Sequence, residues 1–274
     1  MNQNDSLEIT SPANQKIKDI AKLIKDSRDR QKAGIIIVDG QREIEEAIRL
    51  SWEIEEFFYC PEFIKKEEAI LEISQKSKRN YNVSAKVFEK ISYKKNPDGC
   101  LAILKSKFLK LEDVVLKKNP LILVLESVEK PGNLGAIIRT AYVAGVDLLI
   151  LNDQKTDIYS PNVIRSSTGF IFSMPLVLSS VNETFSWLEK NNLNVFITTL
   201  KGKKSHFDVD FTKPSAIVFG TESFGISDDW QKRKVENIRI PMIANVDSLN
   251  VSVSAGIVVY EALRQRNFNL NIWK

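Results

Sequence analysis

The chain has 274 residues, enough for one large α/β domain or two compact ones, because single hydrophobic cores stop growing near about 250 residues. Hydrophobic residues make up 43% of it and charged residues 27%, which are ordinary globular values and exclude wholesale disorder. The net charge of +4 is too small to identify a nucleic-acid-binding protein. We expect two domains that are folded throughout.

The N-terminus carries no sign of a secretory signal. It lacks a basic start, an apolar run and a small-residue cleavage site, and no later stretch approaches the ~18 apolar residues of a membrane span. The two cysteines, Cys60 and Cys100, show neither metal-ligand spacing nor a C-x-x-C pair. We expect a cytoplasmic protein with reduced cysteines and with no disulfide, metal site or membrane contact.

Charges are segregated along the first half of the chain. Residues 42–72 contain four Lys or Arg against ten Asp or Glu, whereas residues 76–118 contain twelve against four. A basic surface of that size could attract phosphate groups by releasing counterions. It is equally consistent with a solvated loop and helix face, and both interpretations stay open.

Hydrophobic periodicity predicts a small α/β unit over about the first hundred residues. Apolar residues at positions 17, 20, 21 and 24, with charged residues between them, predict an amphipathic helix over residues 14–31. The elements predicted after it are a strand at 34–40, a helix at 41–50, a strand at 54–59, a helix at 63–73 and a strand at 100–104.

A lysine-rich stretch at 105–120 predicts a linker, with a domain boundary near residue 115. The elements predicted after it are strands at 121–126, 147–151, 194–199 and 216–219, and helices at 133–144, near 162 and at 251–266. Strands that alternate with helices predict a mainly parallel sheet. Because ligands bind outside the carboxyl ends of parallel strands, chemistry is expected in the loops that follow them.

The first unusual loop, residues 128–140, follows a hydrophobic strand and opens a helix. Asn133 can cap this helix, Gly135 allows close approach of the backbone, and the exposed amide groups favour an anion. Arg139 falls among apolar helix residues. It is therefore either a surface residue with its stem along apolar groups or a buried clamp for phosphate.

The second loop, residues 218–227, places Gly220 and Gly225 on either side of Glu222 after another buried strand. It is neither G-x-G-x-x-G nor a P-loop, because Ile226 follows the last glycine where a P-loop has lysine. The glycines are consistent with a tight exit from the strand as well as with a ligand site.

The third loop, residues 240–254, carries Ser248, Asn250 and Ser252 ahead of the final helix. Ser248 or Asn250 as a helix cap is the simplest explanation of this cluster. Each of the three loops is by itself a weak signal.

Taken together and in this order, the three loops resemble the SpoU/TrmH family of the SPOUT methyltransferase superfamily. The motifs are N-x-G-A-I-x-R-T at 133–140, F-G-x-E-x-x-G at 219–225, and I-P-M followed by S-L-N-V-S-V-S at 240–254. The resemblance covers residues 128–266. The segments ITSPANQKIKDIAKLI and IIIVDGQREIEEAI more loosely resemble the ribosomal-protein-like RNA-binding domain that precedes the catalytic domain in many members.

This resemblance implies an RNA substrate-binding α/β domain with its linker over residues 1–114. Residues 115–274 would form a SPOUT methyltransferase domain, an α/β trefoil-knot fold with a parallel sheet, although no residue pattern reveals a knot. The resemblance also implies a homodimer and S-adenosyl-L-methionine as the cofactor. The residues expected around the adenine and ribose of the cofactor are Thr199, Gly220, Ile240 and Leu249.

The implied reaction is methylation of a ribose 2′-hydroxyl in structured RNA, which needs no metal but needs the oxygen aligned with the methyl group. The family assigns the base to Arg139, yet a guanidinium with a pKa above ~12 is a poor base. Our hypothesis is that Arg139 binds the phosphate beside the target ribose and stabilises the developing alkoxide. The other catalytic candidates are Asn133, Glu222, Ser248 and Asn250. The resemblance implies that Arg139 and Asn133 come from one or both protomers of the dimer.

Other functions compete with this one. A non-catalytic RNA-binding or ribosome-assembly protein that retains the fold would not need all five catalytic candidates. A Rossmann-type methyltransferase would need a glycine-rich first turn that the chain lacks, and an enzyme for small molecules would leave the N-terminal domain without a purpose. Among RNAs, 23S ribosomal RNA is favoured over tRNA, because the N-terminal domain suits a structured hairpin or loop.

His206, the sole histidine, lies in a basic loop that could touch RNA, and histidine acid–base chemistry is not expected.

Overall fold

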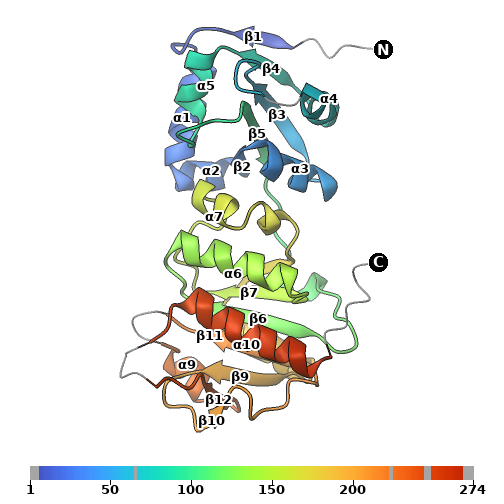
Figure 1. Cartoon of the computed structure of the whole chain (residues 1–274), viewed down its shortest axis with the longest axis vertical. Coiled ribbons are helices and arrows are strands. Elements are labelled where there is room, and N and C mark those ends of the chain that lie inside the picture. Colours follow the sequence, from blue (N-terminus) through green and yellow to red (C-terminus); the bar gives the residue numbers. More distant parts are fainter. Residues whose placement is uncertain (1–5, 65–66, 222–224, 244–247, 268–274) are drawn as a thin grey trace. The chain divides into compact units, whose positions relative to one another are not determined.

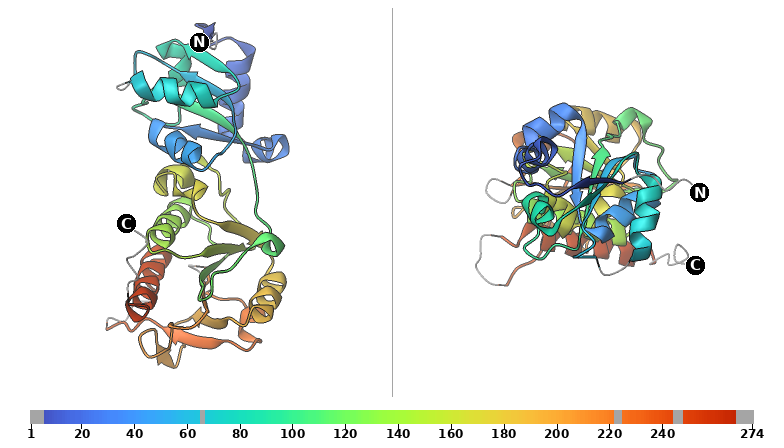
Figure 2. Two further views of the ribbon diagram at one scale, coloured as in Figure 1. Left: turned by 90° about the vertical axis from the view of Figure 1, so that its right-hand side faces the viewer. Right: turned by 90° about the horizontal axis from the view of Figure 1, so that it is seen from above.

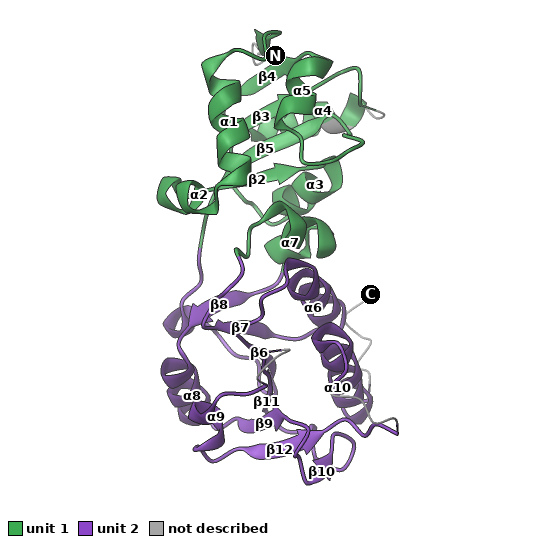
Figure 3. Ribbon diagram, turned by 90° about the vertical axis from the view of Figure 1, so that its left-hand side faces the viewer, with its two compact units in different colours: residues 1–107, 157–173 green, residues 108–156, 174–274 purple. Residues whose placement is uncertain are grey.

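The computed structural model describes residues 6–64, 67–221, 225–243 and 248–267. The chain forms two units: unit 1 contains residues 1–107 and 157–173, and unit 2 contains residues 108–156 and 174–274 (Figure 3). The chain therefore passes between the units at residues 107, 156 and 173. No described helix is both long enough and apolar enough to cross a membrane.

A mixed sheet forms the centre of unit 1 (Figure 1). Its strands are β1 (Leu7–Ile9), β2 (Ile35–Asp39), β3 (Ile54–Tyr59), β4 (Asn80–Val83) and β5 (Cys100–Lys105). They lie in the order β1-β4-β3-β5-β2, with β5 antiparallel to both its neighbours and the other pairs parallel. The carboxyl ends of β1 to β4 therefore lie at one edge, where β5 begins.

The helices that flank this sheet are α1 (Gln15–Lys25), α2 (Ser27–Ala33), α3 (Gln41–Arg49), α4 (Glu67–Lys76) and α5 (Ala85–Ile91). The single helix predicted over 14–31 is two helices, because Asp26 has an extended backbone with φ −109° and ψ 104°. Its carboxylate accepts hydrogen bonds from the backbone N–H groups of Arg28 and Asp29 at 2.9 and 3.1 Å. This cap stabilises a new helix start.

Several short elements of unit 1 were not predicted from the sequence. They are β1, β4 and α5, which have three, four and seven residues. Segments this short carry too few positions for a periodic signal.

Residues 157–173 belong to unit 1, although in the chain they lie between two parts of unit 2. They contain α7 (Pro161–Ser166) and the 3-10 helix η2 (Phe170–Phe172). Trp52 holds them through Nε1, which donates to the carbonyl oxygen of Phe172 at 3.1 Å, and through edge-to-face ring contacts with Tyr159 and Phe172. The Arg30 guanidinium, which is 5% exposed, pairs with Asp157. These buried contacts make the segment a part of the first unit's core.

A seven-stranded sheet forms unit 2. Its strands are β6 (Leu121–Glu126), β7 (Leu148–Asn152), β8 (Leu176–Ser179), β9 (Asn194–Thr198), β10 (Lys204–Ser205), β11 (Ser215–Phe219) and β12 (Glu236–Arg239). They lie in the order β10-β12-β9-β11-β6-β7-β8, and each of these pairings is parallel. The central strands β6 and β11 are buried at every residue, as expected when helices cover both faces.

Helices cover both faces of this sheet. One face carries α6 (Pro131–Val143) and α10 (Val251–Gln265), and the other carries α8 (Val181–Lys190) and α9 (Asp228–Gln231) (Figures 2 and 3). The short 3-10 helix η1 (Leu111–Asp113) precedes the sheet. The mainly parallel α/β architecture predicted for this part of the chain is confirmed, whereas β8, α8 and the short elements β10, α9 and β12 were not predicted.

Candidate active site

The loops that follow β9, β11 and β12 meet at a cavity of about 490 Å³ at the carboxyl edge of the parallel sheet. This volume lies within the range of small-molecule and cofactor sites, roughly 300–1,000 Å³. The residues expected around a cofactor, Thr199, Gly220, Ile240 and Leu249, all line it, as does Ser248. Residues that lie up to 50 positions apart in the sequence thus face one space.

Gly220 allows the loop after β11 to fold back on itself. The backbone N–H of Thr221 donates to the carbonyl oxygen of Gly225 at 2.9 Å, and the N–H of Gly225 donates back to Thr221 at 3.1 Å. A Cβ added at Gly220 would lie only 2.1 Å from the carbonyl oxygen of Gly225. Gly225 itself has a φ of +69°, which favours glycine. Both glycines are therefore required by the turn. The catalytic candidate Glu222 lies outside the described residues.

Two asparagines join the first and third motifs. Asn250 caps α10, since its Oδ1 accepts hydrogen bonds from the N–H and the hydroxyl of Ser252 at 2.9 and 2.6 Å. Its Nδ2 donates to Oδ1 of Asn133 on α6 at 3.2 Å. The expectation that Asn133 caps its own helix was wrong, because α6 begins at Pro131 with Lys130 in the cap position. Asn133 instead links α6 to the start of α10.

Arg139 lies on α6 with its side chain exposed. Its guanidinium forms no hydrogen bond or ion pair with any residue in the described part of the chain. Of the five catalytic candidates, the structure therefore brings Asn133 and Asn250 into contact and places Ser248 on the cavity wall. Within this one chain, Arg139 is an exposed cation rather than a buried clamp.

Sequence reasoning missed two buried polar side chains that end strands of the sheet. Glu126 at the end of β6 is 3% exposed and accepts a hydrogen bond at 2.9 Å from the backbone N–H of Ser227, next to the cavity wall. Asn152 at the end of β7 donates from Nδ2 to the Ser179 carbonyl at 2.8 Å and to Thr184 Oγ1 at 2.7 Å. Each follows a run of apolar residues, and that position was the only sequence signal for them. Lys201, Gln231 and Asn237 also line the cavity, although no motif marked them.

Other side chains with reactive potential do not line this cavity. His206 follows β10, and its backbone N–H donates to the carbonyl oxygen of Arg239 at 2.9 Å. Cys60 and Cys100 are free and buried, and burial raises the pKa of the Cys100 thiol to about 12, which leaves it protonated and unreactive near neutral pH. Among the described residues, no group of three or more His, Cys, Asp or Glu side chains is placed to hold a metal ion.

Comparison with known proteins finds two families in this chain. Residues 120–260 match the SpoU rRNA Methylase family, and residues 14–102 match the MRM3-like substrate binding domain. The chain is 27% identical over 253 residues to the 23S rRNA (guanosine(2553)-2′-O)-methyltransferase RlmP of Bacillus subtilis, which covers 92% of this chain and 98% of that protein. It is 36% identical over 160 residues to the tRNA (guanosine(18)-2′-O)-methyltransferase of Thermus thermophilus, which covers 57% of this chain and 81% of that protein.

Among solved structures, an AdoMet-bound rRNA methyltransferase from Sinorhizobium meliloti has a TM-score of 0.86 and 28% identity, covering 94% of this chain and 97% of that chain. The match to the methylase family spans more than half of the chain and contains all three motifs. The chain therefore belongs to the SpoU rRNA Methylase family.

Proposed function

We propose that this protein is an RNA 2′-O-ribose methyltransferase that uses S-adenosylmethionine, acts on structured 23S ribosomal RNA in the cytoplasm and works as a homodimer. The observation that carries this proposal is the cavity at the carboxyl edge of the seven-stranded sheet, where loops of the second and third motifs meet. Membership of the SpoU family supplies the class of reaction. The link between Asn133 and Asn250 connects the first motif to the same place.

We assign RNA binding to residues 1–114 and methyl transfer to residues 115–274, apart from the segment 157–173, which packs into unit 1. The matches to a substrate binding domain at 14–102 and to the methylase family at 120–260 support this division. A deep trefoil knot in the second part belongs to the same proposal. Membership of the SpoU rRNA Methylase family, from which this knot is expected, supports it.

The cavity fits S-adenosylmethionine, which supplies a methyl group on a sulfonium centre. Its volume of about 490 Å³ and its mixture of apolar and small polar residues suit an adenine and a ribose. Thr199, Gly220, Ile240 and Leu249 would hold these groups largely through backbone atoms. Gly220 matters most in this assignment, because any side chain there would push the loop away from its closed conformation.

Methyl transfer requires the ribose 2′-oxygen to be held in line with the methyl group and to lose its proton. Asn250 is oriented by its cap position and by Asn133, so it offers a rigid polar frame to which Ser248 and Glu222 would contribute. Arg139 is exposed, and its guanidinium offers five N–H donors to RNA. We assign it to the phosphate beside the target ribose and to the developing alkoxide, while the proton leaves to that phosphate or to water.

The homodimer is supported by apolar side chains on the outer face of α10. Val253, Ile257 and Tyr260 are 51%, 36% and 45% exposed and recur at the four- and three-residue spacing of one helix face. Val143 on the adjacent α6 is 41% exposed. An exposed apolar stripe of this kind marks an interaction site, and a second copy of the chain is the occupant we propose. Because α6 also carries Arg139, a dimer on this face would bring that side chain close to the interface.

We prefer ribosomal RNA to tRNA as the substrate, because a relative named for an rRNA target aligns with more of this chain than a relative named for a tRNA target. RlmP, named for a 23S rRNA target, aligns with 92% of this chain, whereas the tRNA enzyme of Thermus thermophilus aligns with 57%. A non-catalytic RNA-binding factor for ribosome assembly is the second candidate. The five catalytic candidates Asn133, Arg139, Glu222, Ser248 and Asn250 are all present in the sequence, which argues against that alternative.

The proposed activity is tested by incubating the protein with S-adenosylmethionine labelled in its methyl group and with unmodified rRNA or tRNA. Label is expected in rRNA as a 2′-O-methyl nucleotide. Label in tRNA alone would show that the target is wrong, and label in neither RNA would favour the non-catalytic alternative. Mapping 2′-O-methyl sites in RNA from cells with and without the gene would then identify the nucleotide.

Replacing Arg139 by lysine tests the proposed phosphate clamp. Lysine keeps the charge but lacks the planar fork, so kcat should fall about 10²- to 10³-fold while the affinity for S-adenosylmethionine stays unchanged. The rate of methyl transfer at saturating RNA measures the fall in kcat. Arg28→Lys, at an exposed position on α2 of unit 1, is the matched control. Retention of most of the turnover by Arg139→Lys, with only weaker RNA binding, would contradict the clamp.

Replacing Gly220 by alanine tests the cofactor site. The added methyl group meets the backbone of Gly225. Since forcing atoms into filled space costs about 1–3 kcal/mol, the affinity for S-adenosylmethionine should fall about 5- to 150-fold. Gly132→Ala is the control, because a Cβ there meets nothing within 4 Å. Calorimetric titration measures both variants. Wild-type affinity in Gly220→Ala would place the cofactor elsewhere.

Replacing Ile257 or Tyr260 by glutamate tests the proposed dimer interface. A charge buried between two copies of α10 without a partner is strongly unfavourable, so either variant should sediment as a monomer and lose methyl transfer. Leu71→Glu, at a 65% exposed position on α4 of unit 1, should leave the wild-type oligomeric state unchanged. Dimers that persist in both α10 variants would exclude this face as the interface.

A further inference from the structure

Unit 1 carries a surface built from two segments that lie far apart in the sequence. One is the loop between α5 and β5, residues 92–99, with the sequence Ser-Tyr-Lys-Lys-Asn-Pro-Asp-Gly. The other is α7, which belongs to the segment 157–173. Tyr93 and Lys94 of the loop and Ile164 and Arg165 of α7 line a single small cavity, so the two segments lie side by side.

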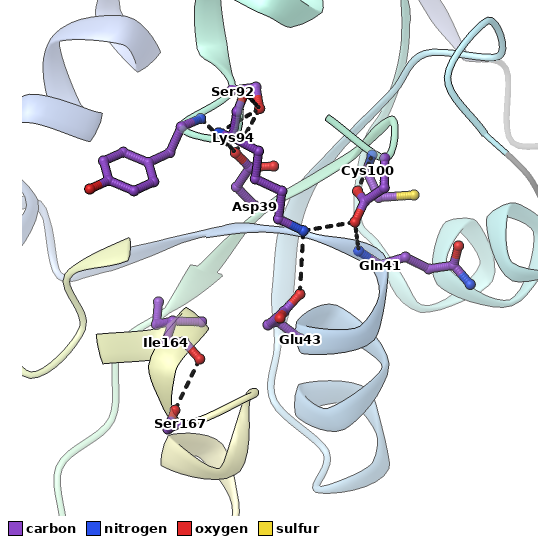
Figure 4. Close-up of polar contacts among 10 residues, drawn as sticks. Asp39, Gln41, Glu43, Ser92, Lys94, Cys100, Ile164 and Ser167 are labelled. Atoms are coloured by element: carbon purple, nitrogen blue, oxygen red, sulfur yellow. Dashed lines mark hydrogen bonds and ion pairs between the residues drawn. The ribbon is translucent and has the colours of Figure 1, made fainter. Parts of the chain in front are cut away.

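A buried carboxylate fixes the conformation of the loop. Asp39 ends β2, and its Oδ2 accepts hydrogen bonds from the Ser92 hydroxyl and from the backbone N–H groups of Tyr93 and Lys94, at 2.8, 2.6 and 3.2 Å (Figure 4). Burial raises the pKa of this carboxyl group, although the three donors oppose the shift. Burying a carboxylate is unfavourable unless its hydrogen bonds compensate. Three successive residues of the loop supply that compensation, so the loop is tied to the end of β2.

Lys94 forms its ion pairs with residues of unit 1. Its Nζ lies 2.7 Å from Oδ2 of Asp98 and 3.6 Å from Oε2 of Glu43 (Figure 4). Gly40 makes room for this arrangement, since an added Cβ would lie 2.1 Å from the Glu43 carboxylate and 2.3 Å from Nζ of Lys94. These carboxylates neutralise the charge of Lys94, and the ion pairs fix the loop at a second point. The neighbouring Lys95 is exposed to solvent.

Tyr93 is held at both ends and yet is exposed. Its backbone N–H donates to Asp39, and its hydroxyl donates to Oδ1 of Asn162 on α7 at 3.0 Å. The residue remains 44% exposed. Lys95 and Arg165 are also exposed, and neither forms an ion pair with a described residue. The surface therefore offers an oriented aromatic ring together with two unpaired cations, and it takes this form only because α7 packs beside the loop.

We propose that this surface binds an unpaired nucleotide of the substrate RNA, with its base stacked on Tyr93 and neighbouring phosphates bound by Lys95 and Arg165. Single-stranded loops of RNA are recognised by bases that stack on aromatic side chains, while cations follow the backbone. A tyrosine with a fixed ring loses little conformational freedom when a base stacks on it. The inference rests on the proposed function, because it assumes that the substrate is RNA.

The stacking contact is tested by measuring the affinity for unmodified rRNA transcribed in vitro. Tyr93→Ala should weaken binding about 5- to 150-fold, the range for loss of one base–aromatic stack. Tyr93→Phe keeps the ring and loses only the bond to Asn162, so its affinity should stay within about threefold of wild type. KM for RNA should rise in Tyr93→Ala, whereas kcat at saturating RNA and the affinity for S-adenosylmethionine should not change.

The phosphate contacts are tested by the salt dependence of binding. The double variant Lys95→Ala/Arg165→Ala should lower the slope of log affinity against log salt concentration by about 1–2, since each lost phosphate contact lowers it by roughly 0.7–0.9. Arg28→Ala removes an exposed cation from α2, which precedes β2 at the opposite edge of the sheet, and should leave the slope unchanged.

Wild-type affinity in Tyr93→Ala together with an unchanged slope in the double variant would overturn the proposal. A decrease of the salt-dependence slope in Arg28→Ala equal to that in the double variant would also overturn it, because binding would then reflect total charge. Methyl transfer by the wild type separates this failure from that of the proposed function. An active enzyme with unaffected variants refutes only this surface, whereas a wild type that binds RNA through Tyr93 but transfers no methyl group refutes only the activity.

Discussion

The parallel pairing of β9, β11 and β12 is the constraint on which the candidate active site depends. Parallel strands end at the same edge, so the loops that follow them meet, even though their residues are tens of positions apart in the chain. If one of these strands ran antiparallel, its loop would open at the opposite edge and the cavity would lose a wall. The buried apolar faces of β6 and β11, covered by helices on both sides, stabilise this arrangement.

A few specific polar contacts then hold the loops together. Gly220 permits the turn that closes at Gly225, Glu126 accepts the N–H of Ser227, and Asn250 joins the start of α10 to Asn133. Glu126 is almost fully buried, and a buried polar group without a partner is unfavourable, so its bond to Ser227 has to be kept. Asn250 therefore has a structural role as a helix cap as well as a proposed role beside the substrate, and the two roles do not exclude one another.

The fold also decides where the segment 157–173 packs. It lies within the half of the chain that matches the methylase family, but Trp52, Arg30 and the residues around Gly169 pack it into unit 1. A Cβ at Gly169 would lie 3.1–3.3 Å from Glu43 and Glu46 of α3, which shows how closely the segment fits. Unit 1 is thus completed by a piece of chain that leaves and returns to unit 2. A surface that includes α7 can exist only when both halves of the sequence are present.

The sequence by itself determined the alternation of strands and helices in the second half, the family, and five residues that line one cavity: Thr199, Gly220, Ile240, Ser248 and Leu249. The alternation depends on hydrophobic periodicity, which acts over a few neighbouring residues. The family and these five residues followed from the resemblance of the three motifs to the SpoU/TrmH family. Only the tertiary structure decided that Asn133 bonds to Asn250, that Arg139 is exposed, and that α7 completes unit 1. Each of these depends on contacts between residues that lie far apart in the chain, and such contacts follow from how the whole sheet and its helices pack.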